Sequence, residues 1–224
     1  MAVINDPSVA ANIQRVGEIA TGATGAAHVV LKPIPTTLGA YRVSYRFAIV
    51  NNQAAASRLF ELRNSGSNLI VVTRLSVRWL QTGAHTAAIE DSLDIYKATG
   101  FSAVDTANVV TVSGSIKRFG MPAAPGNAVI RGVTAAGAAA GMTGGTLTKN
   151  AEPFSGLPHW LLAAVPTAAV TPAIADDMFA QDPATYPFVF AQNEGFVLEN
   201  RVLLGAAASS SVYLDMAWSE VAAY

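Results

Sequence analysis

Regular alternation of side chains near the carboxyl end most constrains what this chain can fold into. From Phe196 onward, one face of the pattern carries Leu198, Asn200, Val202 and Leu204, and the other carries Val197, Glu199, Arg201 and Leu203. After Gly205–Ser211, a second run alternates Val212, Leu214, Met216 and Trp218 with Tyr213, Asp215, Ala217 and Ser219. A period of two residues is typical of β-strands in a packed sheet. We therefore expect Tyr186–Tyr224 to form two long strands and a final hairpin, entered through the connector Ala191–Gly195.

The same alternation marks much of the chain after residue 40. It occurs, or shorter β-rich runs occur, in Tyr41–Ile49, Arg58–Arg63, Leu69–Leu80, Ile89–Thr99, Asn108–Val112, Ser115–Phe119 and Ala128–Val133. Regularly spaced strands with turn residues between them predict an all-β fold, namely a single-domain antiparallel β-sandwich, jelly-roll-like, over residues 40–224. Residues 1–39 are broken by glycine and proline, so we expect an extended N-terminal arm with a short strand at Ala27–Lys32.

Two segments lack this alternation and are expected to be long loops. Ala135–Gly145 consists mainly of alanine and glycine, which predicts a flexible loop. Ala151–Thr185 is rich in proline and alanine, and we expect a single helical turn within it at Ala175–Ala180. Long loops in a compact domain usually carry a function or lie across a neighbouring molecule.

The composition is apolar for a chain of 224 residues, with 51% hydrophobic and only 13% charged residues. About a quarter of the residues are charged in a typical soluble domain. A membrane protein would explain this, but the longest candidate, Leu161–Ala175, is short and contains Pro166 and Pro172, whereas a spanning helix needs about 20 apolar residues. Residues 1–15 also lack the pattern of a signal peptide. We therefore expect a soluble subunit that buries much of its surface against neighbours.

No pattern of residues indicates catalysis or cofactor binding. The absence of cysteine excludes disulfides and thiolate chemistry, and a net charge of −1 gives no reason to expect nucleic-acid binding. Gly17–Thr24 has the glycine spacing of a phosphate loop, but Ala23 stands where lysine is required. The three histidines, which lie far apart and show no metal-binding spacing, are His28, His85 and His159. We predict that the protein is not an enzyme, with no catalytic, cofactor-binding or metal-binding residues and no cofactor.

Charged residues four positions apart share one face of a strand. Basic columns of this kind are Arg42 with Arg46 and Arg74 with Arg78, and an acidic column is Glu90 with Asp94. These columns indicate either cross-strand pairs within a sheet, each contributing roughly 0.2–1 kcal/mol, or a charged face that docks on a partner. We favour internal pairing. Trp160, beside His159, is the aromatic residue expected to be exposed, and contact with a neighbouring chain is favoured there over a ligand pocket.

Two motifs stand out near the carboxyl end. They are Phe188–Leu198, which includes Ala191-Gln192-Asn193-Glu194-Gly195-Phe196, and the ending Ala217-Trp218-Ser219-Glu220-Val221-Ala222-Ala223-Tyr224. Together they resemble the ending of a family of virion structural proteins of tailed bacteriophages. Tyr41–Arg46 and Ala55–Asn64 resemble the amino-terminal half of that family. About a third of the chain is covered, and residues 84–185 are not matched. The connector has a structural interpretation of its own, because Gly195 and Asn193 both tolerate positive φ and can turn the chain.

The resemblance implies a non-enzymatic capsid- or tail-associated protein. Within that class, the apolar composition, the arm and the long loops favour a capsid decoration (cement) protein that binds the major capsid protein and stabilises contacts between capsomers. Such a protein is expected to be a homotrimer on the virion surface, assembled in the host cytoplasm, without nucleic-acid or membrane binding. The alternatives are a tail, collar or baseplate component, or a receptor- or glycan-binding module.

Overall fold

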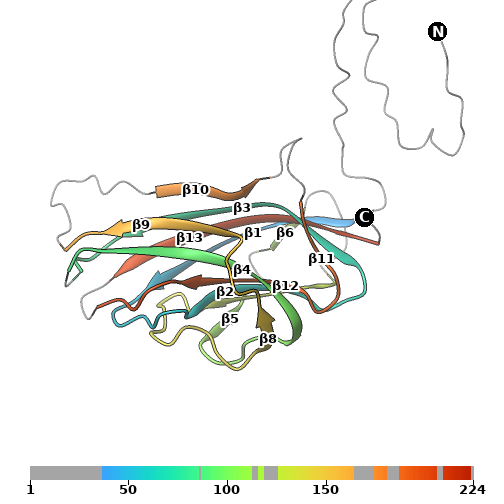
Figure 1. Cartoon of the computed structure of the whole chain (residues 1–224). Coiled ribbons are helices and arrows are strands. Elements are labelled where there is room, and N and C mark those ends of the chain that lie inside the picture. The colour runs from blue at the N-terminus through green and yellow to red at the C-terminus, as the bar shows by residue number, and fades with distance from the viewer. Residues whose placement is uncertain are drawn as a thin grey trace, which may run out of the picture. The chain divides into compact units, whose positions relative to one another are not determined.

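The computed structural model describes residues 37–85, 87–112, 116–118, 126–163, 174–180, 187–205 and 209–222. The chain divides into two units, Met1–Thr37 and Leu38–Tyr224. The expected strand Ala27–Lys32 and nearly all of the expected arm lie outside the described residues. The second unit is almost entirely β-structure and consists of two sheets packed together (Figure 1).

Sheet A contains three long strands and three short ones. They are β1 (Thr37–Ile49), β3 (Leu69–Gln81), β6 (Ile116–Arg118), β10 (Ile174–Ala180), β11 (Phe188–Phe190) and β13 (Ser210–Val221). Their order is β10-β3-β13-β1-β6, and β11 pairs with the same edge of β3 as β10 does. The long β3–β13 pair places Arg78 opposite Tyr213 and Ser76 opposite Asp215.

Sheet B contains seven strands. They are β2 (Arg58–Asn64), β4 (Ile89–Ala103), β5 (Val109–Thr111), β7 (Ala128–Val133), β8 (Thr146–Lys149), β9 (Ser155–Leu161) and β12 (Gly195–Asn200). Their order is β5-β7-β2-β12-β4-β8, and β9 pairs with β4 beside β8.

The strand connectivity is jelly-roll-like, as the sequence predicts. Eight strands form two rows of four, β1-β13-β3-β10 in sheet A and β2-β12-β4-β9 in sheet B. The chain passes between the two rows at most of its connections, which is how a jelly roll closes its two sheets around one core. The shorter strands β5, β6, β7 and β8 all lie in the chain between β4 and β9.

Alternation along the strands fills the core between the sheets. In β1, Tyr41, Val43, Phe47 and Ile49 are buried, as the pattern predicts. Tyr41 stacks on Trp218 of β13 with 5.4 Å between ring centroids. Aromatic contacts also join the two sheets, since the ring centroids of Tyr45 in β1 and Phe60 in β2 lie 6.4 Å apart. Such pairs contribute about 0.5–1.5 kcal/mol beyond the burial of their area.

The expected final hairpin is wrong, because the last two strands belong to different sheets. β12 pairs with β2 and β4 in sheet B, whereas β13 pairs with β3 and β1 in sheet A. Alternation identified the strands but carries no information on their partners. The connector before β12 does turn the chain, with Asn193 at φ 60°. Gly195 is needed for space instead, because a Cβ there would lie 1.9 Å from the carbonyl oxygen of Leu62.

Ala135–Gly145 is a packed segment and not the flexible loop that its composition predicts. Its Met142 is 1% exposed and donates its backbone N–H to the carbonyl of Arg58 at 2.8 Å. Gly137 and Gly141 take φ of 79° and 66°, and added Cβ atoms would lie 2.5 Å and 2.7 Å from backbone oxygens. Small residues therefore allow close backbone approach here.

The helical turn expected at Ala175–Ala180 is also wrong, because this segment lies in β10. It pairs with β3 in antiparallel register, with Ala175 opposite Arg78 and Asp177 opposite Ser76. Pairing with an available strand edge satisfies backbone groups that a single helical turn would leave unpaired. A local pattern of alanines does not reveal that edge.

Candidate functional site

The outward side of β9 is uncharged, although β9 lies at an edge of sheet B. Leu157, His159 and Leu161 point inward and are buried, whereas Gly156, Pro158 and Trp160 are exposed. Among the described strands, β9 pairs only with β4. Natural proteins usually protect such edges with charged side chains or proline. Pro158 limits pairing of another strand with β9, so we expect contact with another molecule through the exposed side chains.

Three exposed apolar side chains flank the beginning of β4. Trp160 is 56% exposed, Leu162 just beyond β9 is 38% exposed, and Leu203 is 63% exposed. Trp160 lies directly opposite the exposed Glu90 of β4. On the other side of β4, the segment that carries Leu203 is held by the N–H of Arg201, which donates to the carbonyl of Ser92 at 2.9 Å. We refer to Pro158, Trp160, Leu162, Leu203 and Glu90 as the β9 edge.

Gln81, at the end of β3, holds the β9 edge in place. Its Nε2 donates to the carbonyl oxygens of Leu162 at 2.7 Å and of Gly83 at 2.8 Å, and its Oε1 accepts from the N–H of Leu162 at 2.9 Å. The N–H of His85 donates to the same Leu162 carbonyl at 3.1 Å. Gln81 is 2% exposed, so these hydrogen bonds are shielded from water and fix the residue after β9 against the β3–β4 connection.

Two histidines that are distant in sequence come together behind this edge. His85 and His159 are 3% and 6% exposed, and the ring of His159 lies 5.1 Å from that of Trp79. Burial lowers the pKa of both, and the charge of His85 lowers the pKa of His159 further. None of their ring nitrogens has a hydrogen-bond partner within the described part of the chain. His28 lies outside it.

Asp91 of β4 lies directly opposite His159 and is 1% exposed. Its Oδ1 accepts the N–H groups of Ser92 at 2.7 Å, Val202 at 3.0 Å and Arg201 at 3.2 Å. Burial raises the pKa of Asp91 to about 6 in spite of these hydrogen bonds. The described residues contain no group of three or more side chains placed to hold a metal ion.

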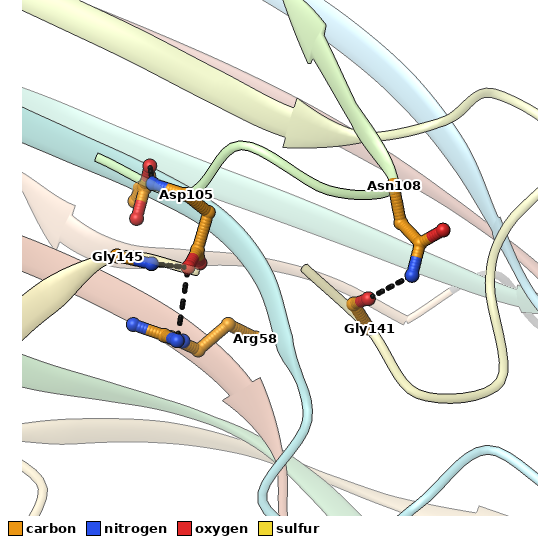
Figure 2. A network of polar contacts seen from close by, with 6 residues as sticks. Arg58, Asp105, Asn108, Gly141 and Gly145 are labelled. Atoms are coloured by element: carbon orange, nitrogen blue, oxygen red, sulfur yellow. Dashed lines mark hydrogen bonds and ion pairs between the residues drawn. The ribbon is translucent and has the colours of Figure 1, made fainter. Parts of the chain in front are cut away.

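A second buried group, centred on Asp105, attaches two loops to the outer face of sheet B (Figure 2). The Oδ1 of Asp105 accepts the N–H of Gly145 at 2.6 Å and lies 2.9 Å from the guanidinium of Arg58. The N–H of Asp105 donates to Oε1 of Glu61 at 2.8 Å. Asn108 donates to the carbonyl of Gly141 at 3.0 Å. Burial raises the pKa of Glu61 to about 7, and the nearby charge of Asp105 adds to the rise.

Sequence patterns missed these buried groups for identifiable reasons. Glu61 alternates with the inward Phe60 and Leu62 and would therefore be expected in solvent, but the loops cover it. The expected acidic column is split, because Glu90 is exposed whereas Asp94 is 7% exposed and accepts from Ser92 at 2.7 Å. The burial of His159 could have been found from its inward position in the alternation of β9. This alternation was overlooked because the segment was expected to be a loop.

The sequence matches no protein-family model and no curated protein. Within the described ranges, no helix has the length and apolar character needed to cross a membrane.

Proposed function

We propose that this protein is a non-enzymatic structural protein of a virion, and specifically a capsid decoration protein that docks through its β9 edge. The observation that carries the proposal is the exposed, uncharged outward side of an edge strand, which presents Trp160 near its end. Tryptophan is among the residues that most often dominate binding energy at protein interfaces. The β9 edge is held by buried hydrogen bonds from Gln81, so little ordering is required on docking.

The architecture and composition support the same proposal. Jelly rolls are used in capsid proteins and also in lectins, so the fold alone is only an analogy. With 13% charged residues, the chain has a surface suited to being covered by neighbours. On this proposal the partner is the major capsid protein, the protein is a homotrimer on the outer shell, and docking adds buried area between capsomers.

Cosedimentation with purified shells that lack the protein tests the proposal. Trp160→Ser is expected to weaken binding about tenfold or more, because an interface tryptophan commonly contributes 2 kcal/mol or more. Val110→Ser is the matched control, since Val110 of β5 is 37% exposed and lies outside the β9 edge. Equal binding by both variants and wild type would contradict docking through this edge.

The number of copies per particle is a second test. Hundreds of copies are expected, whereas a dozen or fewer would instead indicate a tail, collar or baseplate component.

A receptor- or glycan-binding module is the second candidate, and one observation favours it. The exposed indole of Trp160 lies beside the exposed carboxylate of Glu90, which pairs a stacking surface for a sugar ring with an acceptor for its hydroxyl groups. Binding of the isolated protein to a glycan array, lost in both Trp160→Ser and Glu90→Gln, would favour this candidate over decoration.

A further inference from the structure

The outer face of sheet A brings both expected basic columns onto one surface. Four exposed arginines lie on β1 and β3, on either side of the central strand β13: Arg42, Arg46, Arg74 and Arg78. Neighbouring strands are about 4.8 Å apart, so the two columns are separated by roughly 10 Å. We call these arginines, with Tyr213 and Asp215 of β13 between them, the arginine face.

Arg42 of the arginine face is paired with a carboxylate within the chain. Both Nε and a terminal nitrogen of Arg42 contact the carboxylate of Asp215, with Nε at 2.7 Å. This contact lowers the pKa of Asp215, and the charge of Arg74 lowers it further. For Arg42 the expected internal pairing is therefore confirmed.

Arg46 and Arg78 have no acidic partner among the described side chains. The guanidinium of Arg46 lies 5.0 Å from the ring centroid of Tyr213, and its one side-chain hydrogen bond is a 3.4 Å contact with Ser211. Arg78 lies directly opposite Tyr213 in the β3–β13 register and is exposed. Tyr213 is 42% exposed, so the phenol ring and the two guanidiniums face outward together.

We propose that Arg46 and Arg78, on either side of Tyr213, form a binding surface for the carboxylates of an acidic polypeptide segment. Guanidinium groups bind carboxylates through two parallel N–H donors, and stacking on Tyr213 orients Arg46 in advance. A separation of roughly 10 Å corresponds to about three residues of extended chain. Acidic residues two or four positions apart share one face of such a segment, and their flexible side chains would reach both arginines.

The small extent of the arginine face favours a short acidic segment over nucleic acid. This face holds four arginines and one aspartate, in a chain whose net charge is −1. Binding of a long polyanion requires an extended basic surface. A short acidic segment needs no more than the arginine face itself.

Fluorescence anisotropy with labelled heptaglutamate tests this second surface without any virion component, so its outcome is independent of the proposed function. Wild type is expected to bind at 50 mM NaCl and to weaken at 300 mM. The double variant Arg46→Gln/Arg78→Gln should lose at least about tenfold, since each charge-assisted hydrogen bond contributes enough for such a change. Arg201→Gln, an exposed arginine outside the arginine face, is the matched control and should stay within about twofold of wild type.

Two further comparisons test the chemistry. The double variant Arg46→Lys/Arg78→Lys keeps the charge but loses the paired donors of guanidinium. It should bind heptaglutamate about threefold more weakly than wild type. An oligothymidylate of equal charge should bind more weakly than heptaglutamate. Unchanged circular dichroism and thermal midpoints confirm that these exposed substitutions leave the fold intact. The proposal is overturned if wild type shows no saturable binding to heptaglutamate, if Arg201→Gln loses as much as the double glutamine variant, or if the oligothymidylate binds more tightly.

Discussion

On the outer face of sheet A, arginines are exposed to solvent, whereas on the outer face of sheet B acidic side chains are buried beneath loops. Arg42 pairs with Asp215 at a position where both side chains remain substantially exposed. Glu61 and Glu199, in contrast, are at most 4% exposed. The difference arises because the loops on either side of β8 and after β4 cover sheet B and supply donors such as the N–H of Gly145.

This comparison separates charges that hold the fold together from charges that can meet a partner. A buried carboxylate must be paired within the chain, since its solvation is lost and must be replaced. An exposed arginine gains little from an internal partner and can exchange it for another. Electrostatic binding is therefore expected from sheet A, and large effects of charge substitution on stability are expected from sheet B.

The largest effect on stability is expected from the substitution of Asp105, at the loop-covered outer face of sheet B. Asp105→Ala leaves Arg58, whose side chain is 19% exposed, without its ion-pair partner and leaves the N–H of Gly145 unpaired. We expect a loss of about 3–5 kcal/mol in the free energy of unfolding. Urea denaturation monitored by tryptophan fluorescence measures it. A loss below about 1 kcal/mol would mean that the loops are not attached through this carboxylate.

An intermediate effect is expected from the titration of Glu61. Its pKa in the folded protein is raised from 4.5 to about 7, so the protonated form favours folding. The contribution of Glu61 to the free energy of unfolding is fully present below pH 4.5 and is lost as the pH rises to about 7. The loss over this range is roughly 3 kcal/mol. The unfolding free energy of wild type relative to Glu61→Gln should therefore fall by about that amount over this range.

Other titrating groups are common to both proteins in that comparison. Asp91 acts in the same direction as Glu61, because its pKa is also raised. His85 and His159 act in the opposite direction: their pKa values are lowered, so their contribution is present above 6.5 and is lost as the pH falls. Parallel stability curves for wild type and Glu61→Gln would show that Glu61 titrates as it does in the unfolded chain.

The smallest effect on stability is expected on the outer face of sheet A, which is exposed to solvent. Asp215→Ala removes the partner of Arg42, but both side chains are solvated, so we expect a change of at most about 1 kcal/mol. Denaturation under the conditions used for Asp105→Ala gives a direct comparison of the two aspartates. If Asp215→Ala costs as much as Asp105→Ala, the division between a structural face and an accessible face is wrong.

The sequence predicts the strands well where burial follows alternation, and it fails where distant segments cover a surface. Tyr41, Val43 and Phe47 are inward as expected, because each strand faces one common core. Alternation alone does not reveal the burial of Glu61, because the segments that cover it lie more than 40 residues further along the chain. The β9 edge was only partly foreseen: exposure of Trp160 was expected, but its partner Glu90 depends on the register of β4 with β9.

Electron cryo-microscopy of an intact particle tests the central claim, that the protein is a shell component docked through its β9 edge. The account predicts hundreds of copies on the outer capsid, with Trp160 and Leu162 buried against a neighbouring subunit. A dozen or fewer copies confined to the tail, or a shell-bound protein with Trp160 facing solvent, would contradict it.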